Sequence, residues 1–256
     1  RILSSAASDV YKRQFVIGCA PIQVNFLGYP GTSGAKSIDY IIADKNLISD
    51  DNEKFYSEKI IFLPNSYQPN VKDTKISDKK ITKEKCGLAS EKFIFCCFNQ
   101  HQKINPFIFD VWMRILKKNQ NSLLWLLDDN IYSNKNLLYE GEKRGVDKSR
   151  IIFAKRLPLE DHLNRIKFGD LFLDTFPYTA HTTCSDALRV GLPVLTLKGN
   201  SFASRVATSL LRTVKLDDLI SKNLEEYEKI ANKIVSDYDY FRKIKNKLDQ
   251  NILKTP

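Results

Sequence analysis

The sequence has few of the features that place a chain in a membrane or in a secreted, disulfide-bonded scaffold. Its 256 residues contain no apolar run near the roughly 20 residues that a membrane-spanning helix needs. The five cysteines are an odd number and form no Cys-x-x-Cys pair. This pattern indicates reduced thiols, so we expect a cytoplasmic protein without a membrane anchor.

Several familiar signatures of nucleotide and metal sites are also missing. The chain has no Gly-x-Gly-x-x-Gly motif, no P-loop and no His-Glu-x-x-His motif. No Asp-x-Asp pair of the kind that holds a metal–diphosphate follows a predicted strand. If a diphosphate leaves from this protein, lysine and backbone donors must meet its charge in place of a metal ion.

What the chain does have is an excess of positive charge. Forty Lys and Arg stand against 30 Asp and Glu, which gives a formal net charge of +10. An RNA-binding surface is one explanation, and it predicts binding that weakens steeply with salt. The lysines, however, are scattered over polar helix faces and loops and do not alternate with aromatic residues. A solvated surface suited to an anionic partner explains this pattern better.

Strand-like and helix-like patterns alternate through the second half of the chain. Five apolar segments have the length of buried strands, and an amphipathic or polar helical pattern follows each of them: 92–98, 122–127, 150–157, 170–176 and 193–197. Asn105 and Pro106 supply an N-cap and a first-turn proline for the first helix, and Gly191 a C-cap for the fourth. This alternation predicts an α/β fold with a parallel sheet covered on both faces.

The two ends of the chain follow other patterns. After Leu216 the pattern is wholly helical, with apolar residues at packing positions. Residues 1–14 resemble translated sequencing adapter, so we exclude them and expect the natural protein to extend upstream. Residues 15–85 contain two strand-like pieces around a Gly/Pro loop, followed by a lysine-rich linker. We therefore expect 15–85 to be the end of one lobe and 86–256 to be a second lobe.

The candidate ligand site lies where the predicted strands end. His101, His162 and His181 each follow a predicted strand, and an open α/β sheet binds ligands at the carboxyl ends of its strands. Thr182 and Thr183 begin a helix, so their hydroxyls and free backbone N–H groups can face an anion, although a plain threonine N-cap explains them equally well. Lys103 belongs to the same rim and suits a diphosphate. Asp186, one turn into the helix, is placed for a ribose hydroxyl.

Several ordered segments of the chain resemble the catalytic region of the O-GlcNAc transferase and SPINDLY family, most of all its bacterial members with tetratricopeptide repeats. They are "APIQVNFLGYPGTSGAKSIDYIIAD", "YSEKIIFLPNSYQPN", "FCCFNQHQKINP", "RLPLEDHLNRIKFGDLFLDTFPYTAHTTCSDALRVGLPVLTL" and "FASRVATSLL". The resemblance runs from about Phe15 to Gln250. It implies a glycosyltransferase-B fold, with 15–85 as part of the N-terminal lobe and 86–256 as the Rossmann-like C-terminal lobe with its final helices.

The resemblance also implies an activity. It points to an inverting transfer of a sugar, most simply GlcNAc, from a UDP-sugar to Ser or Thr hydroxyls of proteins. The implied reaction needs no metal or other cofactor. The implied partners are the nucleotide-sugar donor, a protein acceptor and upstream tetratricopeptide repeats, with no nucleic acid and no membrane. A nucleotide-binding module without catalysis is the alternative, because part of the first lobe is missing from the matched region.

Residue roles carry over position by position. Lys103 matches the lysine that holds the diphosphate and is needed for catalysis, and His181 the histidine beside it. The other matched positions bind the nucleotide or the sugar. They are Gln100, Thr182 and Thr183 for the diphosphate, Asp186 for the ribose, Pro158, His162 and Arg165 around the base, and Leu27, Gly28 and Tyr178 around the donor sugar.

Four positions depart from the family pattern. Leu159 stands where animal enzymes have a ribose-contacting lysine, so Asp186 carries more of that contact. His101 and Gln102 replace a leucine–tyrosine pair, so His101 is not a family ligand. Tyr178 replaces a smaller residue near the sugar, which leaves the identity of the sugar open.

Overall fold

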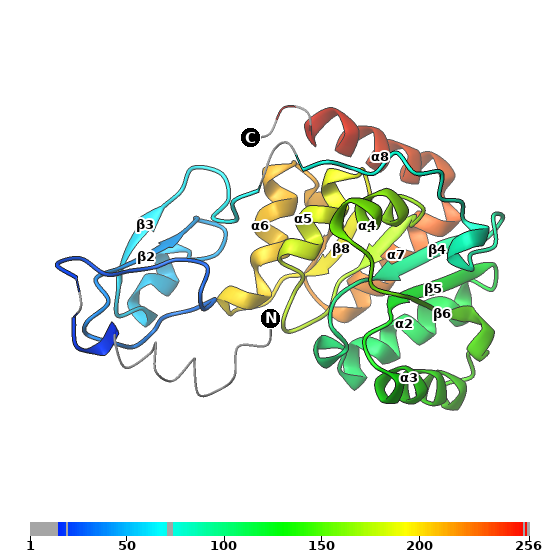
Figure 1. The fold of residues 1–256 in the computed structure, drawn as a ribbon, viewed down its shortest axis with the longest axis horizontal. Helices are drawn as coiled ribbons and strands as arrows, with labels where there is room; N and C mark the ends of the chain where they lie inside the picture. Colours follow the sequence, from blue (N-terminus) through cyan, green and yellow to red (C-terminus); the bar gives the residue numbers. More distant parts are fainter. Residues whose placement is uncertain (1–14, 19, 71–73, 253, 255–256) are drawn as a thin grey trace. The chain divides into compact units, whose positions relative to one another are not determined.

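A computed structural model describes residues 15–18, 20–70, 74–252 and 254, and contacts divide the chain into two compact units (Figure 1). The first unit runs to Pro69 and includes Ser201–Ala203, and the second holds the rest. The adapter-like segment 1–14 lies outside the described residues. The sequence places the boundary after Lys85, whereas the contacts divide the chain after Pro69. The segment before Lys85 belongs to the second unit because it contacts that unit. Lys79 Nζ lies 2.8 Å from Asp161 Oδ2, and the Lys79 carbonyl accepts from Asn164 Nδ2 at 2.8 Å.

The first unit contains a small parallel sheet in the order β1-β2-β3. Its strands are β1 (Val24–Asn25), β2 (Tyr40–Ala43) and β3 (Lys59–Phe62), and a 3-10 helix, η1 (Asp50–Phe55), lies between the last two. The two strand-like pieces of the sequence are confirmed as β1 and β2. The sequence did not predict β3, in which exposed and half-buried residues alternate.

The second unit is built on a six-stranded sheet whose paired strands are all parallel. The strand order is β6-β5-β4-β7-β8-β9. The strands are β4 (Phe93–Cys97), β5 (Ser122–Leu127), β6 (Ile151–Ala154), β7 (Leu171–Leu173), β8 (Val194–Leu197) and β9 (Ile220–Ser221). The five predicted strands are confirmed. The expectation of a wholly helical chain after Leu216 is wrong, because β9 adds a sixth strand at the edge of the sheet.

Helices cover both faces of this sheet (Figure 1). Helices α4, α5 and α6 form one contacting group, and α2 and α7 pack together on the other face. The helices are α2 (Pro106–Lys118), α3 (Ile131–Lys143), α4 (Leu159–Ile166), α5 (Thr182–Arg189), α6 (Val206–Thr213), α7 (Leu224–Ser236) and α8 (Tyr238–Ile252). None of the helices in the described part of the chain is long and apolar enough to cross a membrane.

Local signals in the sequence set the helix ends beside the sheet. Asn105 Oδ1 accepts from the backbone N–H of Ile108 at 3.1 Å, and Pro106 is the first residue of α2. Gly191 has a φ of 74°, and the N–H of Leu192 bonds back to Ala187 O at 2.9 Å. Glycine adopts this left-handed conformation without steric cost, so the predicted end of α5 is confirmed.

Successive strands are added on one side of β4 up to β6 and on its other side from β7 onward, so the order of the strands in the sheet reverses between β4 and β7. β5 and β6 lie to one side of β4 in chain order, whereas β7, β8 and β9 continue on the other side. The loops that leave the carboxyl ends of β4 and β7 therefore diverge to opposite faces and open a crevice between them. This position is where open α/β sheets bind their ligands.

Candidate functional site

A cavity of about 800 Å³ lies at this reversal point of the second unit. Six predicted site residues line it: Gln100, Lys103, Tyr178, His181, Thr182 and Thr183. The other lining residues are Phe98, Asn99, Gln102, Asn105, Leu127, Arg156 and Pro177. The described lining therefore carries two permanent cations, Lys103 and Arg156, and no carboxylate, which favours an anionic ligand.

Lys103 reaches the cavity from a short 3-10 helix, η3 (His101–Lys103), directly after β4. Its Nζ donates to Thr179 O at 3.1 Å and lies 4.1 Å from the centre of the Tyr178 ring. Burial lowers the pKa of Lys103, and the nearby carboxylate of Asp174 opposes that shift. The ammonium is thus partly stripped of water and is ready to pair with an incoming negative charge.

The amino end of α5 forms the opposite wall. His181 is the N-cap and makes no side-chain capping bond, while the N–H groups of Cys184 and Ser185 bond to His181 O at 3.0 and 3.1 Å. The N–H groups of Thr182 and Thr183 have no acceptor within the helix, because the first turn of any helix leaves its donors open. Together with the helix dipole, these donors make a site for a phosphate.

Tyr178 connects the two walls. Its ring stacks on the imidazole of His181, with the ring centres 4.9 Å apart and the planes at 23°. The same ring lies under Lys103 Nζ. The aromatic side chain therefore contacts the lysine and the N-cap histidine at once.

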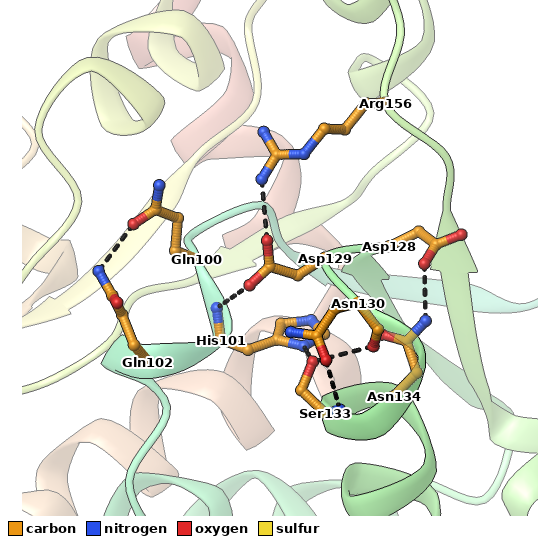
Figure 2. Close-up of polar contacts among 9 residues, drawn as sticks. All are labelled: Gln100, His101, Gln102, Asp128, Asp129, Asn130, Ser133, Asn134 and Arg156. Atoms are coloured by element: carbon orange, nitrogen blue, oxygen red, sulfur yellow. Dashed lines mark hydrogen bonds and ion pairs between the residues drawn. The ribbon is translucent and has the colours of Figure 1, made fainter. Parts of the chain in front are cut away.

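Polar contacts hold the turn after β4 from the side of β5 (Figure 2). The carboxylate of Asp129 accepts from the backbone N–H of His101 at 3.4 Å and from Arg156 Nη2 at 2.9 Å. His101 Nδ1 lies 2.7 Å from Ser133 Oγ, and its side chain is buried away from the cavity lining. Gln102 Nε2 donates to Gln100 Oε1 at 2.8 Å. His101 thus supports the turn, while His181 lines the cavity.

Four predicted nucleotide residues lie in the second unit but outside the cavity lining. His162 packs edge-on against Phe98 at 5.0 Å, and its Nδ1 accepts from Arg165 Nη2 at 3.2 Å. Burial lowers the pKa of His162 to about 4, with the guanidinium charge adding to the effect. Pro158 is exposed and precedes α4, and burial raises the pKa of Asp186 within α5.

The remaining two predicted residues lie in the first unit. Leu27 and Gly28 begin the Gly/Pro loop, and Leu27 has a φ of 60°, which is uncommon for a residue with a side chain. The carboxylate of Glu58 fixes this loop by accepting from Thr32 Oγ1 at 2.6 Å and from Ser33 N at 2.6 Å. The role of Leu27 and Gly28 at the donor sugar stays a prediction.

Sequence reasoning missed three polar residues of the site: Asn99, Asp174 and Arg156. Asn99 follows β4 after one residue, and Asp174 follows β7 directly. Both are buried, and burial raises the pKa of Asp174 to about 6 although several donors oppose that shift. An amide and a carboxylate at the ends of apolar strands are the signal that could have found them. Within the described residues, no three His, Cys, Asp or Glu side chains form a group that could hold a metal ion.

A family model and individual relatives of known name point to the same family of glycosyltransferases. The family model described as glycosyl transferase family 41 matches residues 10–75 and 70–256. The chain is similar to a probable UDP-N-acetylglucosamine–peptide N-acetylglucosaminyltransferase SEC of Arabidopsis thaliana, at 37% identity over 223 residues, which cover 85% of this chain and 23% of the relative. It is also similar to a probable UDP-N-acetylglucosamine–peptide N-acetylglucosaminyltransferase SPINDLY of Eustoma exaltatum, at 32% identity over 244 residues, which cover 93% of this chain and 26% of the relative. The chain thus spans about a quarter of the length of these relatives.

Solved structures agree with this result. An O-GlcNAc transferase from Thermobaculum terrenum, in a mutant form, superposes with a TM-score of 0.80 at 29% identity, covering 92% of this chain and 44% of that one. WaaG, a glycosyltransferase involved in lipopolysaccharide biosynthesis, superposes with a TM-score of 0.62 at 13% identity, covering 96% of this chain and 77% of that one. The second likeness shows the fold alone. The α/β fold with its parallel sheets is therefore that of the glycosyltransferase-B type.

Proposed function

Because the chain belongs to glycosyl transferase family 41, we propose that it is part of the catalytic region of a protein O-glycosyltransferase. Its second unit binds the nucleotide diphosphate of a UDP-sugar, and the sugar, most simply GlcNAc, passes to a Ser or Thr hydroxyl of a protein. The names of the curated relatives, which refer to UDP-N-acetylglucosamine and peptides, support this donor and this acceptor. The free thiols of the described cysteines suit a cytoplasmic location.

One observation carries the proposal. Lys103 and the amino end of α5 line the same cavity, at the reversal point of a parallel sheet, with no carboxylate among the described lining residues. Such a site attracts a group with concentrated negative charge and offers it donors that are already oriented. A nucleoside diphosphate has this charge. His162, which packs against the lining residue Phe98, and Asp186, in α5, are the residues from which we expect contacts to its base and ribose.

The mechanism follows from these donors. The acceptor hydroxyl attacks the anomeric carbon and gives up its proton to a base, while the bond from that carbon to the diphosphate oxygen breaks on the opposite face. The electron pair stays on the diphosphate. Lys103 and the N–H groups of Thr182 and Thr183 neutralise the charge that develops there, so that this chain's own donors do the work that a metal ion does elsewhere. The configuration of the anomeric carbon is inverted.

The substitution Lys103→Ala tests this role. Removing one preorganised donor costs about 3 kcal/mol of transition-state stabilisation, so we expect transfer from radiolabelled UDP-GlcNAc to a Ser/Thr peptide to fall about a hundredfold. The melting temperature should stay within a few degrees of the wild type, because the substitution removes one hydrogen bond, to Thr179 O, and one ring contact, with Tyr178. Lys118→Ala, at an exposed position on α2, removes the same charge and should change neither quantity.

Each outcome bears on a different function. Unchanged transfer in Lys103→Ala would remove the lysine from the mechanism. UDP binding without transfer to any peptide by the wild type would favour the nucleotide-binding module. Binding that depends steeply on salt and shows no preference for UDP would favour an RNA-binding protein.

A further inference from the structure

Beneath the cavity lies a buried polar cluster that the mechanism above does not use. It consists of Asn99, Asp174 and Thr175, whose side chains are 2%, 1% and 0% exposed. Asn99 leaves β4 and the other two leave β7, so the cluster lies between the two strands that diverge at the cavity. Polar groups at this depth cost stability unless each finds a partner.

Asp174 fixes the backbone of the turn that follows it. Its Oδ1 accepts from the N–H of Thr175 at 2.8 Å and from the N–H of Ala180 at 2.7 Å. These two bonds close the segment 175–180 into a loop. Thr179, whose carbonyl accepts from Lys103 Nζ, and Tyr178, whose ring lies under that ammonium, both belong to this loop.

Asn99 connects the same carboxylate to α5. A carboxylate can only accept, so the amide Nδ2 faces Asp174 Oδ1 at 3.3 Å and donates to Thr175 Oγ1 at 2.8 Å. The amide oxygen is left to accept from Thr183 Oγ1 at 2.5 Å. Thr175, in turn, donates its own hydroxyl hydrogen to Tyr178 O at 2.7 Å. The donor and the acceptor of each hydrogen bond among these side chains are thereby fixed.

We propose that Asn99, Asp174 and Thr175 are positioning residues that hold the two walls of the diphosphate site in register. One arm runs through Thr175 to the loop that bears the Lys103 contacts, and the other runs through Asn99 to the first turn of α5. This inference rests on the proposed function, since it assumes that the two walls share one anionic ligand. Of the three, Asn99 lines the cavity, whereas Asp174 and Thr175 do not and act only through the residues they hold.

Two threonines bonded to this network offer a matched comparison. Thr175 and Thr196 are both wholly buried, but only Thr175 is linked to the loop beside Lys103. Thr196 donates to the other oxygen of Asp174, Oδ2, at 2.6 Å from within β8. Valine replaces either threonine with almost no change of shape. Thr175→Val and Thr196→Val therefore each remove a buried hydroxyl next to the same carboxylate, and only the first breaks the arm toward the cavity.

The experiment measures the affinity for UDP by calorimetry at pH 8, together with the melting temperature. We expect both variants to melt at lower temperature than the wild type. Thr175→Val should bind UDP at least about tenfold more weakly, which is the effect of one misplaced charge-assisted donor. Thr196→Val should bind within twofold of the wild type. Thr175→Ser, which keeps the hydroxyl, should restore most of the affinity.

Equal UDP affinities in the two valine variants and the wild type would overturn the inference, since the cluster would then be structural only. A wild type that binds no UDP would instead overturn the proposed function, so the two failures are distinguishable. If Thr175→Val does not fold, Thr175→Ala removes the same hydroxyl without adding a methyl group. The same tenfold loss is expected there, and an unchanged affinity has the same adverse meaning.

Discussion

At the scale of single residues, Tyr178 is the side chain that contacts both Lys103 and His181. The Leu variant, Tyr178→Leu, removes the ring that lies 4.1 Å from the ammonium and stacks at 4.9 Å on the imidazole. A ring–cation contact and a ring–ring contact are each worth about 1 kcal/mol, so we expect UDP binding to weaken about tenfold. Calorimetry at constant ionic strength measures this change.

The matched control keeps the ring. Tyr178→Phe retains both contacts and should bind UDP within twofold of the wild type. If the leucine variant binds as well as the phenylalanine variant, the ring does not order the site, and Lys103 must be held by Thr179 O alone.

The sequence predicted the charged and helix-start residues of the cavity better than the buried polar residues Asn99 and Asp174. Lys103, His181 and Thr182 could be placed together because each follows an apolar strand, and the ends of parallel strands share an edge. Asn99 and Asp174 pair across 75 positions of sequence. Their positions at the ends of apolar strands mark each as a candidate, but only the fold shows that the two side chains contact each other.

At the scale of elements, Arg150 joins the end of α2 to the start of β5. Its guanidinium is buried and donates to Leu116 O at 2.8 Å, Asn119 O at 2.7 Å and Ser122 O at 3.0 Å. It thereby satisfies carbonyls that the last turn of a helix leaves open. Arg150→Met would remove this donor from Leu116 O and Ser122 O, while Asn119 O keeps its bond from the Ser122 hydroxyl at 2.6 Å, so we expect a loss of about 3 kcal/mol in the free energy of unfolding.

Urea denaturation measures this loss, and Arg114 provides the comparison. Arg114 Nε lies 2.8 Å from Glu228 Oε2, but its side chain is 51% exposed. Exposed ion pairs contribute less than about 1 kcal/mol, so Arg114→Met should be nearly neutral. UDP affinity should stay unchanged in both variants. Equal losses of stability in Arg150→Met and Arg114→Met would show that the Arg150 hydrogen bonds at the end of α2 do not stabilise the fold more than an exposed ion pair does.

The elements themselves were predicted where the apolar runs are long. β4 and β5 and the capped start of α2 follow from five or six consecutive buried residues and from Asn105-Pro106. β9 was missed because it has two residues, Ile220 and Ser221, which are too few to show a pattern. The predicted strands at 150–157 and 170–176 are shorter in the structure. β6 ends at Ala154, opposite the last residue of β5, and β7 pairs with β4 at Leu171 and Phe172.

At the scale of the whole molecule, two buried groups oppose each other in their effect of pH on stability. Burial lowers the pKa of His162 from its ordinary value of 6.5 to about 4, so folding loses stability as the pH falls through that window. Burial raises the pKa of Asp174 from 3.8 to about 6, so its ionisation costs stability as the pH rises through nearly the same window. Each effect is worth about 3 kcal/mol, and they nearly cancel.

Single substitutions should therefore separate the two effects. Asp174→Asn leaves His162 unopposed, so its free energy of unfolding, relative to that of the wild type, should rise by about 3 kcal/mol between pH 4 and pH 6.5. His162→Gln should show the opposite slope relative to the wild type. Denaturant titrations at five pH values give both slopes. Parallel pH profiles for all three proteins would contradict the assignment of buried, oppositely shifted groups.

The division of the molecule was predictable in kind but not in position. Change of pattern near the lysine-rich segment indicated two lobes, whereas the contacts divide the chain at Pro69. The segment from Lys75 to Cys86 looks like a linker because it has few apolar residues. It is held instead by backbone and charged contacts, such as Ser77 N to Glu160 O at 3.1 Å, which leave no periodic trace in a sequence.

We infer that Lys103 and the amino end of α5 together bind one diphosphate. A crystal structure of this chain with UDP tests it most directly. We predict the β-phosphate within hydrogen-bond distance of Lys103 Nζ and of the backbone N–H of Thr182 or Thr183. A diphosphate bound elsewhere, with Lys103 still bonded to Thr179 O and no phosphate at α5, would show that these donors do not form the diphosphate site.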